Sequence, residues 1–115
     1  MKKNLILIVI FYFVLIISSY GAGGASGDAG STNYYKKGES LIKRAKKLEK
    51  KGKIKKANKR YEKALKYLIK SNIEKPNQPD TLNYLGFATR KLGDYEKGEE
   101  YYLLGLQIDP DHKGI

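Results

Sequence analysis

The sequence predicts an all-α fold made of two tandem helical hairpins. After Thr32 the apolar residues recur at helical spacing. Proline occurs only at Pro76, Pro79 and Pro110, where this periodicity breaks. Glycine and alanine recur at matching places in the two halves, as expected where paired helices approach closely. These three observations predict the fold class, and each segment supports it in turn.

Composition limits the domain organisation and the chemistry. The chain has 115 residues, of which about 20 at the N-terminus have the character of a targeting segment, so at most one small domain remains. It contains no cysteine, no tryptophan and one histidine. A disulfide scaffold, cysteine-based zinc sites, thiol catalysis and a lipid-modified lipoprotein N-terminus are therefore excluded.

Residues 1–22 have the order of a secretory signal peptide. Two lysines form a positive n-region, Leu5–Ile17 is an unbroken apolar run, and small residues between positions 18 and 24 suit signal peptidase. An uncleaved membrane anchor is the alternative, although the apolar run is shorter than the ~20 residues of a membrane span. We expect export to the periplasm or cell envelope, with anchoring in the inner membrane as the less favoured outcome.

Residues 23–32 consist of glycine, serine, alanine and threonine with a lone Asp28. Such a composition cannot bury apolar area, so we expect a flexible linker between the targeting segment and the folded part.

Residues 33–76 are expected to form the first hairpin, with a turn at Gly52. After the turn the apolar residues form a helical stripe: Ile54, Ala57, Tyr61, Ala64, Leu65 and Leu68. We expect this apolar face to continue through Ile69 and Ile73, so that the second helix runs long before Pro76. Lys53 precedes this helix and supplies no N-cap oxygen, which predicts a poorer helix start.

Residues 79–112 are expected to form the second hairpin, with helices from about Pro79 to Leu92 and from Tyr95 to Ile108. Gly93 is placed to end the first helix, and Asp94 supplies an N-cap oxygen to the second. Three glycines would let the two backbones approach each other: Gly86, Gly98 and Gly105.

This second hairpin resembles the tetratricopeptide repeat, a helical hairpin with a period of about 34 residues. Gly86 stands at the small position of the family's first helix, Tyr95 at its aromatic position, and Asp109-Pro110 at its terminal proline. Gly98 and Gly105 depart from the family, which usually carries alanine there. This departure should weaken the helix by up to ~1 kcal/mol per glycine.

The first hairpin is a weaker match to the same family. Aligning Gly52 with Gly93 places Ala57 and Ala64 where the second unit has glycines. The step of 41 residues exceeds one repeat by 7, which is close to two helical turns. The resemblance implies a short right-handed solenoid, and an unrelated pair of hairpins or a coiled coil is the alternative.

No catalytic constellation is found in the sequence. His112 is the lone histidine, and we expect it to be solvated rather than to bind a metal. The acidic residues of the second hairpin surround a helix start, where they complement the helix dipole: Asp94, Glu96, Glu99 and Glu100. We therefore predict a non-enzymatic protein with no cofactor and no metal.

The net charge of +11 is unevenly distributed. Residues 26–78 contain 17 basic and 5 acidic side chains, and residues 79–115 contain 4 and 7. A polybasic cluster in the first hairpin could bind an anionic membrane surface or envelope polymer: Lys43, Arg44, Lys47, Lys50, Lys51, Lys55 and Lys56. Nucleic acid is not an expected partner, because the protein is expected to be exported. The alternative is that these lysines are a solvated helix face.

The family resemblance implies a groove for a peptide, lined by the first helix of each hairpin. The positions carried over from the family are Glu39, Ile42, Lys46, Glu49, Asn83, Phe87 and Arg90. Phe87 is the strongest candidate for a binding hot spot, because an aromatic residue off the packing face suits that role. The alternative is that Phe87 packs against the neighbouring hairpin.

Two repeats leave the outer face of the second unit uncovered, since at least three are normally needed. Self-association, a capping partner or truncation of a longer repeat protein would resolve this. The leading functional hypothesis is an exported interaction module or scaffold that binds a protein or peptide in the bacterial cell envelope. The alternative is a polybasic binder of an anionic membrane surface or envelope polymer.

Overall fold

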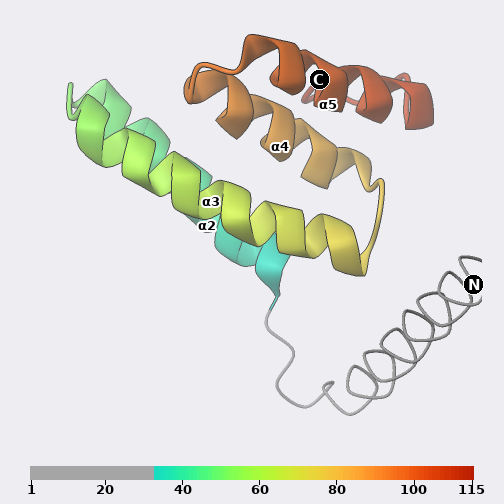
Figure 1. The fold of residues 1–115 in the computed structure, drawn as a ribbon, viewed down its shortest axis with the longest axis horizontal. Coiled ribbons are helices and arrows are strands. Elements are labelled where there is room, and N and C mark those ends of the chain that lie inside the picture. Colours follow the sequence, from blue (N-terminus) through green and yellow to red (C-terminus); the bar gives the residue numbers. More distant parts are fainter. Residues whose placement is uncertain (1–32) are drawn as a thin grey trace, which may run out of the picture. The chain divides into compact units, whose positions relative to one another are not determined.

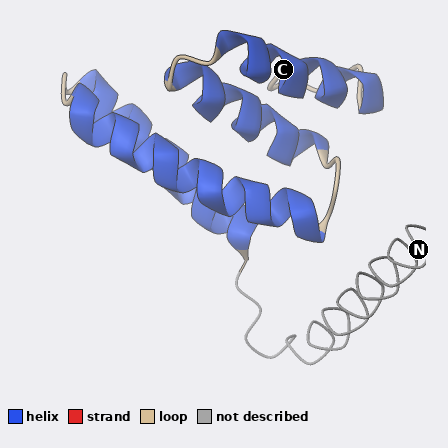
Figure 2. Ribbon diagram, in the orientation of Figure 1, coloured by secondary structure: helices blue, strands red, loops and turns tan. Residues whose placement is uncertain are grey.

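The structure is a computed structural model that describes residues 33–115. The predicted signal peptide or anchor and the predicted linker lie outside the described residues. Four helices follow one another: α2 (Tyr34–Lys50), α3 (Ile54–Glu74), α4 (Pro79–Lys91) and α5 (Tyr95–Ile108). Residues 33–115 contain no strand, so this part of the chain is all-α as predicted (Figures 1 and 2). None of its helices is long and apolar enough to cross a membrane.

The helices pair in chain order. α2 packs against α3 and α4 packs against α5, so two hairpins form, as the sequence indicates. α4 also contacts α3 and α2, whereas α5 contacts α4 alone among the described helices. Figure 1 shows α4 lying between the first hairpin and α5. The two hairpins therefore stack through α4.

The turns inside the two hairpins depend on glycines with left-handed backbone angles. Gly52 has φ +74° and Gly93 has φ +100°, a region that other residues rarely adopt. Asp94 caps α5 as predicted, because its side chain accepts a hydrogen bond from the backbone N–H of Lys97 at 3.1 Å. Lys53 makes no side-chain capping bond to α3, which confirms the poorer helix start.

The core lies between the helices of both hairpins. Its buried apolar residues are Leu41, Ile42, Ala45, Ala57, Tyr61, Ala64, Leu68, Leu82, Leu85 and Ala88. The stripe predicted for α3 is thus right for Ala57, Tyr61, Ala64 and Leu68.

The prediction of a buried apolar stripe on α3 is wrong at both ends of the stripe. Ile54, Ile69 and Ile73 are exposed, and Ile73 retains 73% of its surface. Ile54 is the first residue of α3 and lies at the turn. Ile69 follows the buried Leu68 by one position, which rotates its side chain about 100° around the helix. α3 has 21 residues against 14 in α5, so it is longer than its counterpart, as predicted. The apolar side chains of Ile69 and Ile73 in its final turns are, however, exposed.

Small residues set the distance between α4 and α5. A Cβ atom added to Gly86 would lie 3.0 Å from the carbonyl oxygen of Gly98, and one added to Gly98 would lie 3.0 Å from that of Gly86. These two glycines mark the predicted close approach. Gly105 faces α4 at a second position, because a Cβ atom added to it would lie 3.5 Å from the Cβ atom of Leu82 on α4, and it also faces Ile115.

Candidate interaction surface

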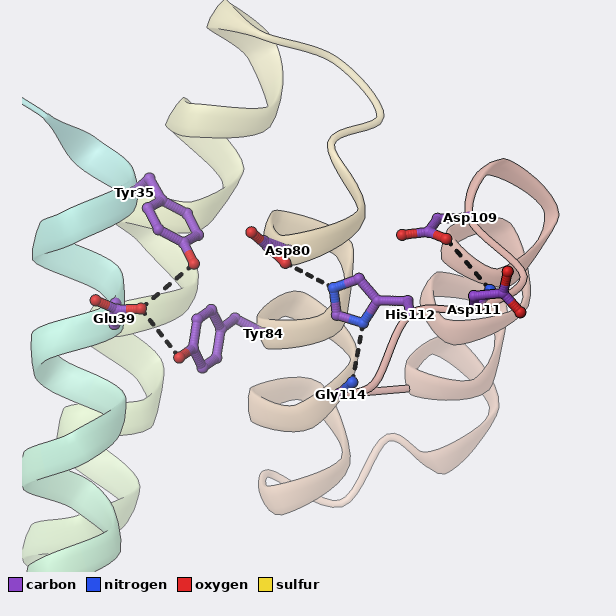
Figure 3. Close-up of polar contacts among 8 residues, drawn as sticks. All are labelled: Tyr35, Glu39, Asp80, Tyr84, Asp109, Asp111, His112 and Gly114. Carbon is purple, nitrogen blue, oxygen red and sulfur yellow. Dashed lines mark hydrogen bonds and ion pairs between the residues drawn. The ribbon is translucent and has the colours of Figure 1, made fainter.

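Glu39 of α2 joins the two hairpins. Its Oε2 atom accepts hydrogen bonds from the hydroxyls of Tyr35 at 3.3 Å and Tyr84 at 3.1 Å (Figure 3). Tyr84 lies on α4, so the second of these bonds crosses between hairpins. Burial raises the pKa of both tyrosines, and the Glu39 carboxylate raises each pKa further. Both hydroxyls therefore stay protonated and able to donate.

Glu49, near the other end of α2, makes a second joint. Its carboxylate accepts a hydrogen bond from the Tyr61 hydroxyl at 3.1 Å and from the Lys91 ammonium at 2.9 Å. Tyr61 lies on α3 and Lys91 on α4. The hydrogen bond from Lys91 is the main cause of a lowered pKa at Glu49. This side chain therefore connects three helices in its ionised form.

Phe87 of α4 packs against the first hairpin. Its ring meets the buried Tyr61 ring edge-on, with 5.9 Å between the centroids. The ammonium groups of Lys46 and Lys91 lie 4.6 and 5.5 Å from the Phe87 centroid, which is cation–π distance. Phe87 is half-buried in this setting. Its position therefore agrees with the alternative prediction, in which it packs against the neighbouring hairpin.

A hollow of about 440 Å³ opens beside Phe87. We call it the Phe87 hollow, and its lining residues are Glu49, Phe87, Arg90, Lys91, Tyr95 and Tyr102. The Arg90 guanidinium lies 6.0 Å from the Tyr95 ring centroid and 5.8 Å from that of Tyr102. Burial raises the pKa of Tyr102, while the charge of Arg90 opposes that rise. The hollow thus combines aromatic rings with a guanidinium group.

The structure brings together four of the seven predicted groove residues and places the other three elsewhere. Glu49, Phe87 and Arg90 line the Phe87 hollow, and Lys46 lies over the Phe87 ring. Glu39 lies near the other end of α2, where its Oε2 bonds to two tyrosines.

Two other predicted groove residues lie elsewhere. Ile42 is 0% exposed, so the prediction that it faces a partner is wrong. The reason is that α2 packs against both α3 and α4, which widens the stripe that it buries. Asn83 is half-exposed and lies next to Gly114 of the C-terminal tail.

The expectation that His112 is solvated is wrong. Its side chain is 12% exposed, and its Nε2 atom lies 2.6 Å from the Asp80 carboxylate. Its Nδ1 atom accepts a hydrogen bond from the backbone N–H of Gly114 at 3.0 Å (Figure 3). Because an accepting Nδ1 carries no proton, Nε2 is the protonated nitrogen that donates to Asp80. The histidine therefore attaches the C-terminal tail to the start of α4. Residues 33–115 hold no group of three or more side chains that could bind a metal.

Comparison with known families identifies the second hairpin. Residues 80–112 match the family model of the tetratricopeptide repeat. The second hairpin is a tetratricopeptide repeat. Neither a curated protein nor a solved structure matches the chain. The tetratricopeptide repeat is generally a non-enzymatic module that mediates protein–protein interactions.

The tyrosines and Lys91 around this tetratricopeptide repeat were not among the predicted site residues. A signal for some of them exists in α4, where Asp80, Tyr84, Phe87 and Lys91 follow one another at spacings of four, three and four residues. Such spacing places side chains on one face of a helix. It identifies the side of α4 that carries Tyr84, Phe87 and Lys91 toward α2.

The predicted polybasic cluster is exposed throughout and flanks the turn of the first hairpin: Lys43, Arg44, Lys47, Lys50, Lys51, Lys55 and Lys56. Within residues 33–115, Lys43 is its one member with an ion-pair partner, Glu39 at 3.5 Å. Binding of an anionic surface by this cluster stays a prediction.

Proposed function

We propose that this chain is an exported interaction module of the cell envelope and that it binds a polypeptide partner at the Phe87 hollow. The observation that carries the proposal is the lining of this hollow. Tyr95 is 66% exposed and Arg90 is also exposed, so both can contact a partner. Tyrosine and arginine are among the residue types most enriched in binding hot spots. The repeat family supports a general role in protein–protein interaction, and the lining of the hollow supports this location for the binding site.

The hollow favours a particular kind of side chain. Phe87, Tyr95 and Tyr102 offer ring surface, and Arg90 offers guanidinium donors between them. The carboxylate of Glu49 already accepts bonds from within the chain. We therefore expect the partner to place an apolar or aromatic side chain in the hollow and a carboxylate or carbonyl oxygen beside Arg90.

Peptide selection tests this proposal. Peptides selected from a displayed random library against the wild-type protein are measured against Tyr95→Ala and Arg90→Ala. Loss of a hot spot, at about 2 kcal/mol, should weaken binding about 30-fold. Leu103→Ala is the matched control, because Leu103 is an exposed α5 residue that does not line the hollow. Phe87→Ala is a poorer test, since it also removes packing against Tyr61. Selected peptides that bind all variants equally would refute the location.

The exported location rests on residues 1–22, whose charge and apolar pattern is that of a signal peptide. N-terminal sequencing of the protein recovered from fractionated cells tests it. A mature chain that begins between residues 20 and 25 in an envelope fraction supports the proposal, whereas an intact Met1 in the cytosolic fraction contradicts it.

A second candidate function is binding of an anionic membrane surface or envelope polymer by the polybasic cluster. Its support is that this exposed cluster is almost free of ion pairs within the part of the chain that the structure describes. Salt distinguishes the two candidates. Binding through exposed lysines should fall steeply as ionic strength rises, because the Debye length shortens to a few ångströms. Binding at the Phe87 hollow should change little.

A further inference from the structure

A different cationic surface follows the seam between α2 and α3. Two shallow hollows of about 430 and 330 Å³ lie there, and both are lined by Lys63 and Tyr67. α2 contributes Lys36, Lys37 and Arg44 to the first hollow. α3 contributes Lys59, Lys63, Lys66 and Lys70. We call this surface the seam groove, and it shares only Arg44 with the polybasic cluster.

The positive charge of the seam groove is uncompensated. None of its seven cations forms an ion pair with another residue between 33 and 115, and Glu62 is the one carboxylate among the residues lining it. Lys59 and Lys63 are four residues apart, as are Lys66 and Lys70. Like charges at this spacing destabilise a helix. Apart from the cation–π contacts of Lys37 and Lys70, residues 33–115 give these cations no stabilising partner, which favours a role in binding.

Aromatic surface lies in the middle of this charge. The rings of Tyr34 and Tyr67 are stacked, with 6.1 Å between centroids and 23° between planes. Lys37 lies 5.4 Å from the Tyr67 centroid, and Lys70 lies 5.4 Å from that of Tyr34. Tyr67 is half-buried and lines both hollows, so a ligand along the seam would pass over its ring.

We propose that the seam groove binds an extended acidic segment of another polypeptide. Positions 59 to 70 of α3 span about 16 Å at the helical rise of 1.5 Å per residue. An extended chain covers that length with about five residues at roughly 3.3 Å each. Its carboxylates would reach cations from both helices, and an apolar or aromatic side chain would lie on Tyr67. A membrane surface is disfavoured, because it is flat and cannot enter hollows between two helices. This proposal is independent of the Phe87 hollow.

Fluorescence anisotropy tests the proposal with the purified protein and a labelled five-residue peptide of four glutamates around a central phenylalanine. The groove variant carries Lys37→Glu and Lys63→Glu, one change on each helix. The matched control carries Lys51→Glu and Lys55→Glu, which make the same change in net charge outside the groove. We expect the groove variant to bind at least tenfold more weakly than wild type and the control to bind within threefold. Tyr67→Ala should weaken binding of this peptide more than it weakens binding of an all-glutamate peptide.

Thermal unfolding separates lost binding from lost folding. Lys37→Glu removes the contact with the Tyr67 ring but places a negative charge near the start of α2, and Lys63→Glu replaces repulsion with Lys59 by attraction. These effects oppose each other, so the groove variant should melt close to the wild-type temperature. Equal weakening in groove variant and control would overturn the proposal, because it would show binding to net charge alone. Binding to vesicles of anionic lipid but not to the peptide would overturn it in favour of a membrane. Self-association that the peptide does not compete with would overturn it in favour of a second copy.

Discussion

Two glycine-to-alanine substitutions should change stability in opposite directions. Gly86 and Gly105 both lie inside helices, where alanine is favoured over glycine by up to ~1 kcal/mol. A Cβ at Gly86 would lie 2.5 Å from the Tyr102 ring and 3.0 Å from the carbonyl oxygen of Gly98. Neither neighbour can yield cheaply, because one is a packed ring and the other is backbone. A Cβ at Gly105 would meet chiefly the Cδ1 atom of Ile115, at 2.5 Å, which is the end of a flexible terminal side chain.

The magnitudes follow from these contacts. Overpacking costs about 1–3 kcal/mol, so Gly86→Ala should lose up to about 2 kcal/mol after the gain of ~1 kcal/mol in helix propensity. Gly105→Ala should gain up to ~1 kcal/mol, because Ile115 can move aside. For a domain of this size 1 kcal/mol corresponds to about 4–8 °C in melting temperature. The two variants should therefore differ by about 1–3 kcal/mol and melt about 4–24 °C apart.

Far-UV circular dichroism of thermal unfolding measures this difference. Wild type should lie between the two variants, and reversibility on cooling is the control. If Gly86→Ala melts at or above the temperature of Gly105→Ala, then α4 and α5 do not approach at the Gly86–Gly98 contact, and the packing described for the second hairpin is wrong.

Three further substitutions test the joints and caps. Glu49→Gln should cost less than ~1 kcal/mol in urea unfolding near neutral pH, because its partner Lys91 is partly exposed. The pKa of Glu49 is lowered in the folded state from its usual value of 4.5. The stabilisation by the Glu49 carboxylate is therefore complete above pH 4.5 and is lost as the pH falls through the lowered pKa. The free energies of unfolding of wild type and variant should then converge in acid. Lys53→Asp should add ~0.5–2 kcal/mol to the free energy of unfolding by supplying the missing N-cap of α3, and an unchanged value would contradict the capping argument. His112→Ala should release the tail from Asp80, which hydrogen exchange of residues 109–115 would detect as lost protection.

The hairpins were predictable because their signals are local. Gly93 and Asp94 determine the turn between α4 and α5 by their own backbone and side-chain properties, and no distant contact is needed. Ala57 and Ala64 were correctly placed in the core by their helical spacing with Tyr61.

The candidate site was less predictable because it depends on how the hairpins stack. Ile42 was assigned to a binding face, but stacking of α4 on α2 buries it. His112 has its partner Asp80 at a separation of 32 residues, which no local pattern reveals. The joint between Glu39 and Tyr84 spans 45 residues and is hidden from the sequence for the same reason.

The placement of the carboxylates in α2 accounts for the difference between the two proposed surfaces. Glu39 and Glu49 are the only acidic residues of this helix, and the polar partners of both lie outside the seam groove: Tyr35, Lys43 and Tyr84 for Glu39, and Tyr61 and Lys91 for Glu49. No carboxylate of α2 is therefore left to neutralise the cations on its side of the seam groove. A ligand at the Phe87 hollow meets charges that are already partly paired, whereas a ligand in the seam groove meets exposed and unpaired ones. Salt should therefore weaken binding strongly in the seam groove and only slightly at the Phe87 hollow.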